Sequence, residues 1–303
     1  QPVLIDDACE PKQAVPAANR VINSGAKFAV AHVCSGVTVP AAKIYEEEGI
    51  VAITPGATAP QVTDNLKGRY FFRTIGRDDQ QGPAAAKFII NKAKPKKVAV
   101  LHDKQSYGQG IAASVRDELK KANVEVALFE GINAGDSDYS AVITKLKSAG
   151  ADFVYYGGYH PEMGLLLRQA AEQGLKVRMM GPEGVGNPEI NAIAGNAVEG
   201  MLVTLPADPA SKPENAALVK AFKDKGRDAS GAFQMGAYTA TQVLAQSIKA
   251  VGDDAEKVAD YLHKTTFNMP TGNVAWDAKG DLKAFDFPVY SWHKDGSKSV
   301  AEK

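Results

Sequence analysis

The sequence predicts an α/β fold with two doubly wound parallel-sheet lobes. Short β-rich runs alternate with helical stretches along most of the 303 residues, and several of these runs are apolar on both faces. Such strands, separated by helices, are typical of a parallel sheet that helices cover on both sides. At roughly 100–200 residues per domain, the length suggests about two domains. The handedness of crossover connections then favours the doubly wound arrangement.

The expected elements follow one another in a regular order. A first short strand is expected at 3–5, and further strands are expected near 28–33, 51–54, 70–74, 97–102, 125–129, 153–157, 176–180 and 200–205. Amphipathic stretches predict helices near 11–24, 38–48, 79–93, 108–122, 137–149, 161–173 and 188–195. After Pro206 come three helical segments near 213–226, 231–251 and 254–264, short strands near 272–276 and 285–292, and a polar tail.

Composition excludes several classes of protein. Lys and Arg together number 35 and so do Asp and Glu, and this zero net charge argues against a general nucleic-acid binder. No run approaches the ~20 apolar residues that a membrane-spanning helix needs. The first residues show no basic, apolar and small-residue leader, which also fits a mature exported chain.

The two cysteines, Cys9 and Cys34, each follow an apolar stretch. If the two stretches are neighbouring parallel strands, both thiols emerge at the same sheet edge, where a disulfide is geometrically feasible. Two buried free thiols are the alternative. Only His32 lies close enough in sequence to join them, so no metal site is predicted. We favour the disulfide, which implies an oxidising compartment.

Motifs for nucleotide binding and catalysis are weak. Residues 108–113 read G-x-G-x-x-A, but six polar residues separate the first glycine from the preceding strand, and a Rossmann turn has no room for them. His102 and His160 each end an expected strand and could meet in a cleft as acid–base groups, although ordinary loop histidines are the simpler interpretation. No cofactor and no catalytic residue is predicted.

Small polar residues follow two strands of the expected first lobe. Ser35 comes after one strand and opens a helix, and the next strand ends in Thr54-Pro55-Gly56-Ala57-Thr58. Open α/β sheets bind ligands at the carboxyl ends of their strands. Helix N-terminal N–H groups, together with hydroxyls, are suited to a carboxylate. Ordinary N-capping is the structural alternative for Ser35 and Thr58.

The expected second lobe offers complementary groups at its own strand ends. Tyr107 and Tyr159 follow two strands, and Glu183 follows a third between glycines. A carboxylate in such a position suits pairing with an ammonium ion. The two tyrosines can cover an apolar side chain while their hydroxyls remain hydrated.

Several long stretches resemble the periplasmic leucine/isoleucine/valine-binding proteins, the substrate-binding components of branched-chain amino-acid ABC transporters. These stretches run from near the first residue almost to the last, at residues 6–14, 53–60, 101–108, 153–163, 181–185 and 276–283. The resemblance implies the type I periplasmic binding protein fold, with two lobes joined by a three-stranded hinge. It also implies the Cys9–Cys34 disulfide.

The resemblance further implies the lobe boundaries. The first lobe is expected to comprise 1–76 plus 207–284, and the second 77–206 plus 285–303. The family begins with a strand, a loop and a helix that precede the first residue here, so the first lobe is expected to be incomplete at its N-terminus.

The resemblance assigns ligand contacts to residues already noted. The α-carboxylate contacts fall on Ser35 and Thr58, and the α-ammonium contacts on the Gly56 carbonyl, Thr58 and Glu183. Gly56 replaces alanine or serine of some members, so a looser pocket floor is expected there. The second-lobe residues that close over the amino acid correspond to Tyr107 and Tyr159. The apolar walls around its side chain correspond to Val33, Cys34, Ala57 and Phe233.

The implied function is that of a non-enzymatic carrier. A monomeric periplasmic chain would capture a small aliphatic, branched-chain L-amino acid by hinge closure and deliver it to a membrane permease. A two-lobed sensor for another small amino acid, a γ-amino acid or an amide is the main alternative. An enzyme and an interaction-only protein are weaker alternatives, which steady turnover or a flat surface without a pocket would favour.

Overall fold

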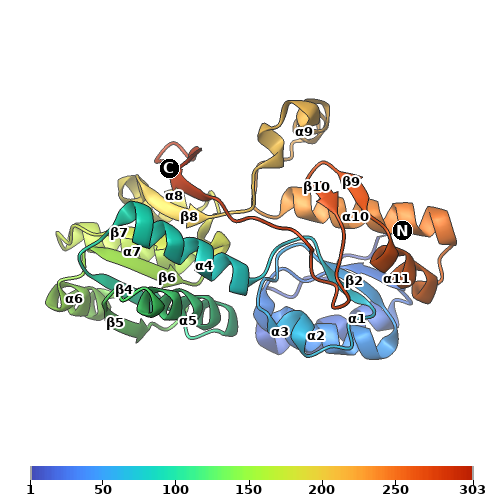
Figure 1. The fold of residues 1–303 in the computed structure, drawn as a ribbon, viewed down its shortest axis with the longest axis horizontal. Helices are drawn as coiled ribbons and strands as arrows, with labels where there is room; N and C mark the ends of the chain where they lie inside the picture. Colours follow the sequence, from blue (N-terminus) through green and yellow to red (C-terminus); the bar gives the residue numbers. More distant parts are fainter. Residues whose placement is uncertain (1, 302–303) are drawn as a thin grey trace. The chain divides into compact units, whose positions relative to one another are not determined.

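The computed structural model describes residues 2–301 and divides the chain into two compact units (Figure 1). Unit 1 contains the residues up to Arg77 together with Asp208–Phe285, and unit 2 contains Asp78–Ala207 together with the residues from Asp286 onward. The chain therefore passes between the units three times. Each crossing lies one residue beyond the expected boundary.

Unit 1 contains a parallel three-stranded sheet in the order β1-β2-β3. Its strands are β1 (Phe28–Val30), β2 (Val51–Thr54) and β3 (Phe71–Arg73). A separate antiparallel pair is formed by β9 (Phe267–Met269) and β10 (Gly272–Val274). The helices are α1 (Ala14–Asn23), α2 (Ser35–Glu48), α3 (Gln61–Asp64), α9 (Ala216–Asp224), α10 (Gln234–Val251) and α11 (Ala255–Lys264), with short 3₁₀ turns at Pro11–Gln13, Pro209–Ser211 and Pro213–Asn215.

Helices cover both faces of the unit 1 sheet because β2 is apolar on both sides. Val51 and Ile53 pack with residues of α10 and α11, whereas Ala52 packs with residues of α1 and α2. All three side chains are fully buried. The two helical layers lie on opposite sides of β2 in Figure 1.

Unit 2 contains a seven-stranded sheet in the order β12-β11-β8-β7-β6-β4-β5. The strands are β4 (Val98–His102), β5 (Val126–Gly131), β6 (Phe153–Gly157), β7 (Arg178–Gly181), β8 (Met201–Thr204), β11 (Val289–Trp292) and β12 (Lys298–Val300). The helices are α4 (Asp78–Phe88), α5 (Ser106–Lys121), α6 (Ser140–Ala149), α7 (His160–Glu172) and α8 (Ile190–Ala194), with a π-helical turn at Ile89–Ala93 and 3₁₀ turns at Glu183–Val185 and Gly195–Val198.

The five strands from β4 to β8 are parallel, and their order reverses beside β4. The chain goes from β4 outward to β5 and then returns to the other side of β4 to form β6. The connections after β4 and β6 therefore leave in opposite directions, so the carboxyl ends of these two strands form a topological switch point, the usual ligand position in open α/β sheets. Unit 2 thus has the doubly wound arrangement expected from the sequence.

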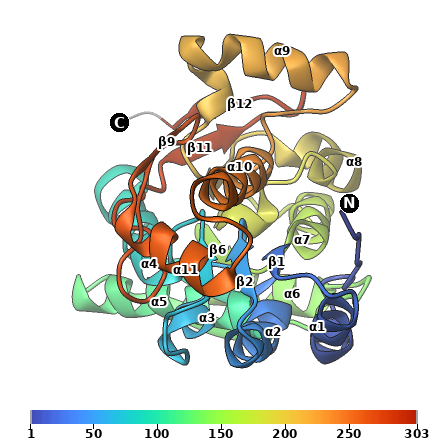
Figure 2. The same ribbon diagram turned by 90° about the vertical axis from the view of Figure 1, so that its right-hand side faces the viewer.

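Helices also enclose the unit 2 sheet on both faces. Val100 and Tyr155 pack on one face with side chains of α4 and α5. The alternating residues Leu101 and Val154 are also fully buried, because α6 and α7 lie on the opposite face (Figure 2). Two-sided burial explains why these strands are apolar at successive positions.

Several expected elements differ from the structure. Residues 3–5 form no strand: Leu4 is 95% exposed and Val3 60%, so the segment lacks the half-buried, hydrogen-bonded setting that a strand requires. The polar tail instead contributes β12, because pairing with β11 satisfies its backbone groups. Helix α2 begins at Ser35 and not near 38, which places this serine in the first turn of the helix.

The Cys9–Cys34 disulfide is confirmed, with a Cα–Cα distance of 5.4 Å. Since no strand forms at 3–5, a turn brings Cys9 into place. The Asp6 and Asp7 carboxylates accept hydrogen bonds from the N–H groups of Ala8 and Cys9, both at 2.8 Å. These bonds stabilise the positive φ angles of Ala8 and Cys9, 52° and 54°.

A buried histidine fixes this turn to the rest of unit 1. Asp7 Oδ2 lies 2.5 Å from His32 Nδ1, and His32 Nε2 lies 2.9 Å from the Tyr45 hydroxyl on α2. Burial and the Asp7 charge raise the pKa of Tyr45 to about 12, so its hydroxyl remains protonated. The turn that carries Cys9 is thus held through His32, two residues before Cys34.

Removing the disulfide is expected to lower the free energy of unfolding of unit 1 by about 2–4 kcal/mol, because the bond constrains the unfolded chain between residues 25 apart. Each unit has one tryptophan, Trp276 in unit 1 and Trp292 in unit 2. Urea unfolding followed by fluorescence in a Trp292→Phe background therefore reports on unit 1. The Cys9→Ala/Cys34→Ala chain should unfold at lower urea, and an unchanged midpoint would contradict the prediction.

Candidate functional site

In unit 1, the structure brings four predicted residues together at the carboxyl end of β2. Ser35 starts α2, and Gly56, Ala57 and Thr58 lie in the loop after β2. The Ser35 hydroxyl accepts a 3.2 Å hydrogen bond from the N–H of Ala59, which joins the helix start to that loop. Ser35 is 2% exposed and Thr58 fully buried. Within residues 2–301 the Ser35 hydroxyl hydrogen is donated to no other residue, so it can serve an anionic ligand.

The shape of this loop is fixed by Thr54, the last residue of β2. Its hydroxyl donates to the His32 carbonyl at 2.5 Å and accepts from the N–H groups of Gly56 and Ala57 at 3.2 and 2.9 Å. One side chain therefore turns the chain sharply at the strand end, a common use of threonine in loops. Thr58 is placed directly after this turn.

Gly56 is closely packed and does not loosen the pocket floor, contrary to the sequence-based expectation. A Cβ atom added there would lie 2.7 Å from Val33 Cγ1 and 3.2 Å from the Val33 carbonyl oxygen. Val33 belongs to the predicted apolar wall and is 39% exposed. The glycine thus allows the loop to contact the backbone beside Val33.

Sequence reasoning missed Arg73, whose side chain donates hydrogen bonds to the loop after β2. Arg73 ends β3 and is fully buried. Its guanidinium donates to the carbonyls of Ala57 and Ala59 at 3.0 and 2.9 Å, and its Nε donates to Asp281 at 2.7 Å. A charged residue near the end of an expected strand is usually exposed, so nothing in the sequence pattern indicated that Arg73 is buried.

Phe233, the predicted wall residue from the later part of the chain, lies directly before α10 and is partly buried. The first turn of α10 is fixed to the residue after β3, because the Thr74 hydroxyl donates to the Gly236 carbonyl at 3.0 Å. A Cβ atom on Gly236 would lie 3.4 Å from the Pro55 carbonyl. The start of α10 is therefore adjacent to the loop after β2.

In unit 2, Tyr107 and Tyr159 meet at the topological switch point. Tyr107 lies in the first turn of α5 after β4, and Tyr159 precedes α7 after β6. Their ring centroids are 5.1 Å apart with the planes tilted by 39°. Tyr107 is 2% exposed. The sequence placed both tyrosines at strand ends, and the strand order explains why these two ends are neighbours.

Glu183 lies beside the tyrosine pair, in the 3₁₀ turn after β7, and is 3% exposed. The N–H of the next residue, Gly184, donates to the Tyr107 hydroxyl at 3.2 Å. Glycine is required at this point, since an added Cβ would lie 2.7 Å from the Gly158 carbonyl and 2.9 Å from the Tyr107 ring. The three predicted residues of the second lobe therefore form one cluster.

This cluster is electronegative. Burial raises the pKa of Tyr107 and of Tyr155 well above the usual tyrosine value, and the charges of Glu183 and Asp78 raise it further. The tyrosines consequently remain neutral and keep their hydroxyl protons. A cation placed here would be stabilised by the two buried carboxylates.

The stability of unit 2 is expected to depend on pH through Asp103, the residue after β4. Its side chain is 2% exposed, Oδ1 accepts from the Gln105 N–H at 2.9 Å, and Oδ2 has no hydrogen-bond partner among the described residues. Burial is the main reason that the pKa of Asp103 is raised to about 6. Ionising this carboxyl therefore costs folding free energy above pH 6, and the cost disappears below the ordinary aspartate pKa.

Asp103→Asn is accordingly expected to raise the free energy of unfolding by about 2–3 kcal/mol at pH 8, because a raised acid pKa penalises the folded state only when the group is charged. The gain should shrink to near zero at pH 4. Urea unfolding at the two pH values measures it, with the exposed Asp136→Asn as control. An equal gain at both pH values would contradict the assignment to ionisation.

The glycines and histidines of the other sequence motifs make structural contacts. Gly108 and Gly110 of the G-x-G-x-x-A run lie inside α5, and Gly108 allows that helix to approach β6, since a Cβ there would be 2.5 Å from the Gly157 carbonyl. His102 Nδ1 accepts from the Lys104 N–H at 3.1 Å. His160 lies 3.3 Å from Glu189. Both histidines thus have ordinary loop contacts.

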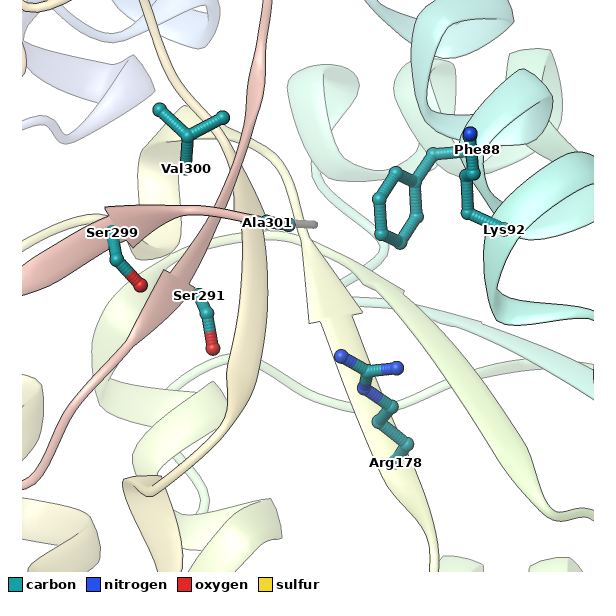
Figure 3. Close-up of a pocket in the computed structure, with 7 residues that line it drawn as sticks. All are labelled: Phe88, Lys92, Arg178, Ser291, Ser299, Val300 and Ala301. Carbon is teal, nitrogen blue, oxygen red and sulfur yellow. The ribbon is translucent and has the colours of Figure 1, made fainter. Parts of the chain in front are cut away.

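A cavity of about 470 Å³ in unit 2 lies away from the predicted residues (Figure 3). It is lined by Phe88, Lys92, Arg178, Ser291, Ser299, Val300 and Ala301. Arg178 begins β7, whereas Glu183 follows the end of that strand, so the cavity is at the opposite edge of the sheet. In Figure 3 the Lys92 side chain extends away from Arg178, and the two cations do not converge.

Comparison with known proteins identifies the family to which this pair of units belongs. Residues 1–297 match the family described as periplasmic binding protein. The chain is a periplasmic binding protein. This confirms the resemblance inferred from the sequence, and it accounts for two α/β units joined by three crossings.

Relatives of this periplasmic binding protein align with it over most of the length of both chains. It is 58% identical over 298 residues to the leucine-, isoleucine-, valine-, threonine- and alanine-binding protein of Pseudomonas aeruginosa, covering 98% of this chain and 80% of that one. It is 49% identical over 303 residues to the Leu/Ile/Val-binding protein of Escherichia coli K12, covering 100% and 82%. The leucine-binding protein LivK of Thermotoga maritima superposes with a TM-score of 0.90 at 30% identity, covering 99% and 86%.

Within residues 2–301 of this periplasmic binding protein, no helix combines the length and the apolar character that crossing a membrane requires.

Proposed function

We propose that this periplasmic binding protein is the substrate-binding component of an ABC transporter and captures a small aliphatic, branched-chain L-amino acid. The observation that carries the proposal is the pair of residue clusters, one after β2 in unit 1 and one around Glu183 in unit 2, whose polar groups suit opposite charges. Ser35 in unit 1 has a buried hydroxyl with a hydrogen to donate. In unit 2 Glu183 is buried, and its charge acts on the two tyrosines that pack on each other, Tyr107 and Tyr159. A zwitterion has the two charges that these clusters complement.

In this proposal Ser35 and Thr58 bind the α-carboxylate, and Glu183 binds the α-ammonium together with Thr58 and the Gly56 carbonyl. Tyr107 and Tyr159 close over the ligand. The apolar wall comprises Val33, Cys34, Ala57 and Phe233.

The energies fit micromolar or tighter binding. Hydrogen bonds to charged groups contribute roughly 1.5–3 kcal/mol each. Burying ~100 Å² of aliphatic surface adds about 2–3 kcal/mol. The costs of association and of ordering reduce this sum, and about −8 kcal/mol corresponds to a micromolar dissociation constant.

The relatives' printed names support this ligand class, since two of them name leucine, isoleucine and valine. We further propose that the protein is a monomer, works in the periplasm without enzymatic activity, and delivers its ligand to a membrane permease after hinge closure.

Isothermal titration calorimetry on one preparation tests the proposal with leucine, isoleucine, valine, alanine and γ-aminobutyrate. We expect the three branched-chain amino acids to bind at micromolar or lower dissociation constants and γ-aminobutyrate to bind far more weakly, because its charged groups are further apart. Preferred binding of γ-aminobutyrate, or no binding of any branched-chain amino acid, would contradict the proposal.

A further inference from the structure

A glutamine that no sequence motif marked lies at the centre of the unit 2 cluster. Gln81 is in the first turn of α4 and its side chain is fully buried. Its Nε2 donates to Glu183 Oε2 at 2.5 Å and to Asp78 Oδ1 at 3.3 Å. Its Oε1 accepts from the Thr204 hydroxyl at 2.6 Å and from the Glu183 N–H at 3.2 Å.

These contacts allow only one orientation of the amide. A glutamine side chain has two N–H donors and two acceptor positions on its oxygen, and all four are used here. Turning the amide by 180° would direct its NH₂ group at the Glu183 N–H and its oxygen at two carboxylates. In the turned orientation both of these contacts would leave buried polar groups unpaired, which is costly. Gln81 is therefore held rigidly.

The rigid amide in turn fixes the carboxylate of Glu183. Gln81 contacts Glu183 at both ends, through the backbone N–H and through Oε2. The backbone contact sets the start of the 3₁₀ turn, and the side-chain contact restricts rotation of the carboxylate. Asp78, 2% exposed, shares the same NH₂ group, so one neutral amide separates two buried carboxylates.

We propose that Gln81 is a positioning residue that orients the Glu183 carboxylate towards the α-ammonium group of the ligand. This inference rests on the proposed function and refines it. Gln81 does not contact the ligand: its four hydrogen-bonding positions are occupied within unit 2, and it acts through Glu183. Binding should therefore depend on Gln81 only when the ligand carries an ammonium group.

The test compares two ligands that differ only in that group, leucine and 4-methylpentanoate. Gln81→Met keeps the length of the side chain and removes its hydrogen bonds. The dissociation constant for leucine, from calorimetry, should rise ~10–100-fold, the effect of losing the orientation of one charged partner. The thermal shift produced by millimolar 4-methylpentanoate should be unchanged, because that ligand makes no ammonium contact.

Two further variants control the experiment. Gln169 on α7 also uses both amide atoms, donating to the Ser137 carbonyl at 2.8 Å and accepting from the Tyr139 N–H at 2.7 Å, so Gln169→Met should leave leucine affinity within about twofold. Thr204→Val removes only the hydroxyl that holds Gln81 Oε1. This milder variant should weaken leucine binding several-fold and decides the question if Gln81→Met does not fold.

The outcomes are distinguishable. Loss of leucine affinity with an unchanged response to 4-methylpentanoate supports the positioning role. Equal weakening of both ligands, or unchanged leucine affinity in the folded variants, overturns it while leaving the proposed function intact. Failure of the unaltered protein to bind leucine, isoleucine or valine overturns the proposed function and this inference together.

Discussion

Glu183→Gln is expected to weaken leucine binding by about 2–5 kcal/mol, because it would remove the carboxylate from the proposed charge pair and leave the ligand ammonium unpaired. The substitution keeps the size of the side chain and an oxygen that can accept from Gln81, so the unit 2 cluster should remain folded. Glu183 is 3% exposed, which limits compensation by water. Calorimetry with leucine measures the change.

A surface glutamate in the same unit provides the matched control. Glu172 on α7 is 64% exposed in its side chain and pairs with Arg168 at 3.8 Å. Glu172→Gln should leave leucine affinity unchanged, since exposed ion pairs contribute little. If Glu183→Gln binds leucine as tightly as the unaltered protein, the assignment of the ammonium contact is wrong.

Asp281→Ala is expected to lower the free energy of unfolding of unit 1 by about 3–5 kcal/mol, because it removes the buried Asp281 carboxylate that pairs with the buried Arg73 guanidinium. Asp281 is 4% exposed and accepts from Arg73 Nε at 2.7 Å, from Arg77 Nη1 at 2.6 Å and from the Thr63 hydroxyl at 3.0 Å. Leucine affinity should also fall, because Arg73 supports the loop that carries Thr58.

The same cluster contains an exposed acid for comparison. Asp64 pairs with Arg77 at 3.1 Å and Lys279 at 2.7 Å, and hydrogen bonds from these two side chains lower the pKa of Asp64 to about 2. Its side chain is 37% exposed, so Asp64→Asn should cost under about 1 kcal/mol. Urea unfolding in the Trp292→Phe background measures both variants. Equal costs for Asp64→Asn and Asp281→Ala would show that burial does not govern this network.

Much of the fold could be predicted from periodicity, because burial on both faces leaves a clear apolar signature. The strand at 51–54 is an example: its expected bounds match β2. The strand expected at 3–5 was wrong because apolar residues form a strand only with a hydrogen-bonding neighbour. Strand β12 was missed for the converse reason, since pairing with β11 stabilises a polar segment without an apolar pattern.

The candidate site was predictable where function requires unusual residues at strand ends. Glycines, hydroxyls and the Glu183 carboxylate after strands indicate ligand chemistry whatever the strand order. Arg73 and Gln81 were not predictable, because their importance arises from burial and from partners distant in the sequence: Asp281 lies 208 positions from Arg73. A residue that acts through another side chain leaves no pattern in the sequence around it.

The final segment of the chain has a consequence for biosynthesis. Strand β11 pairs with β8, although the polypeptide leaves unit 2 at Ala207 and re-enters it at Asp286. In unit 1, the residues of α10 and α11 that bury β2 likewise belong to its second stretch of chain. Neither unit can finish its core before its second stretch of chain has emerged, so each must remain open to chaperones and proteases until that stretch arrives.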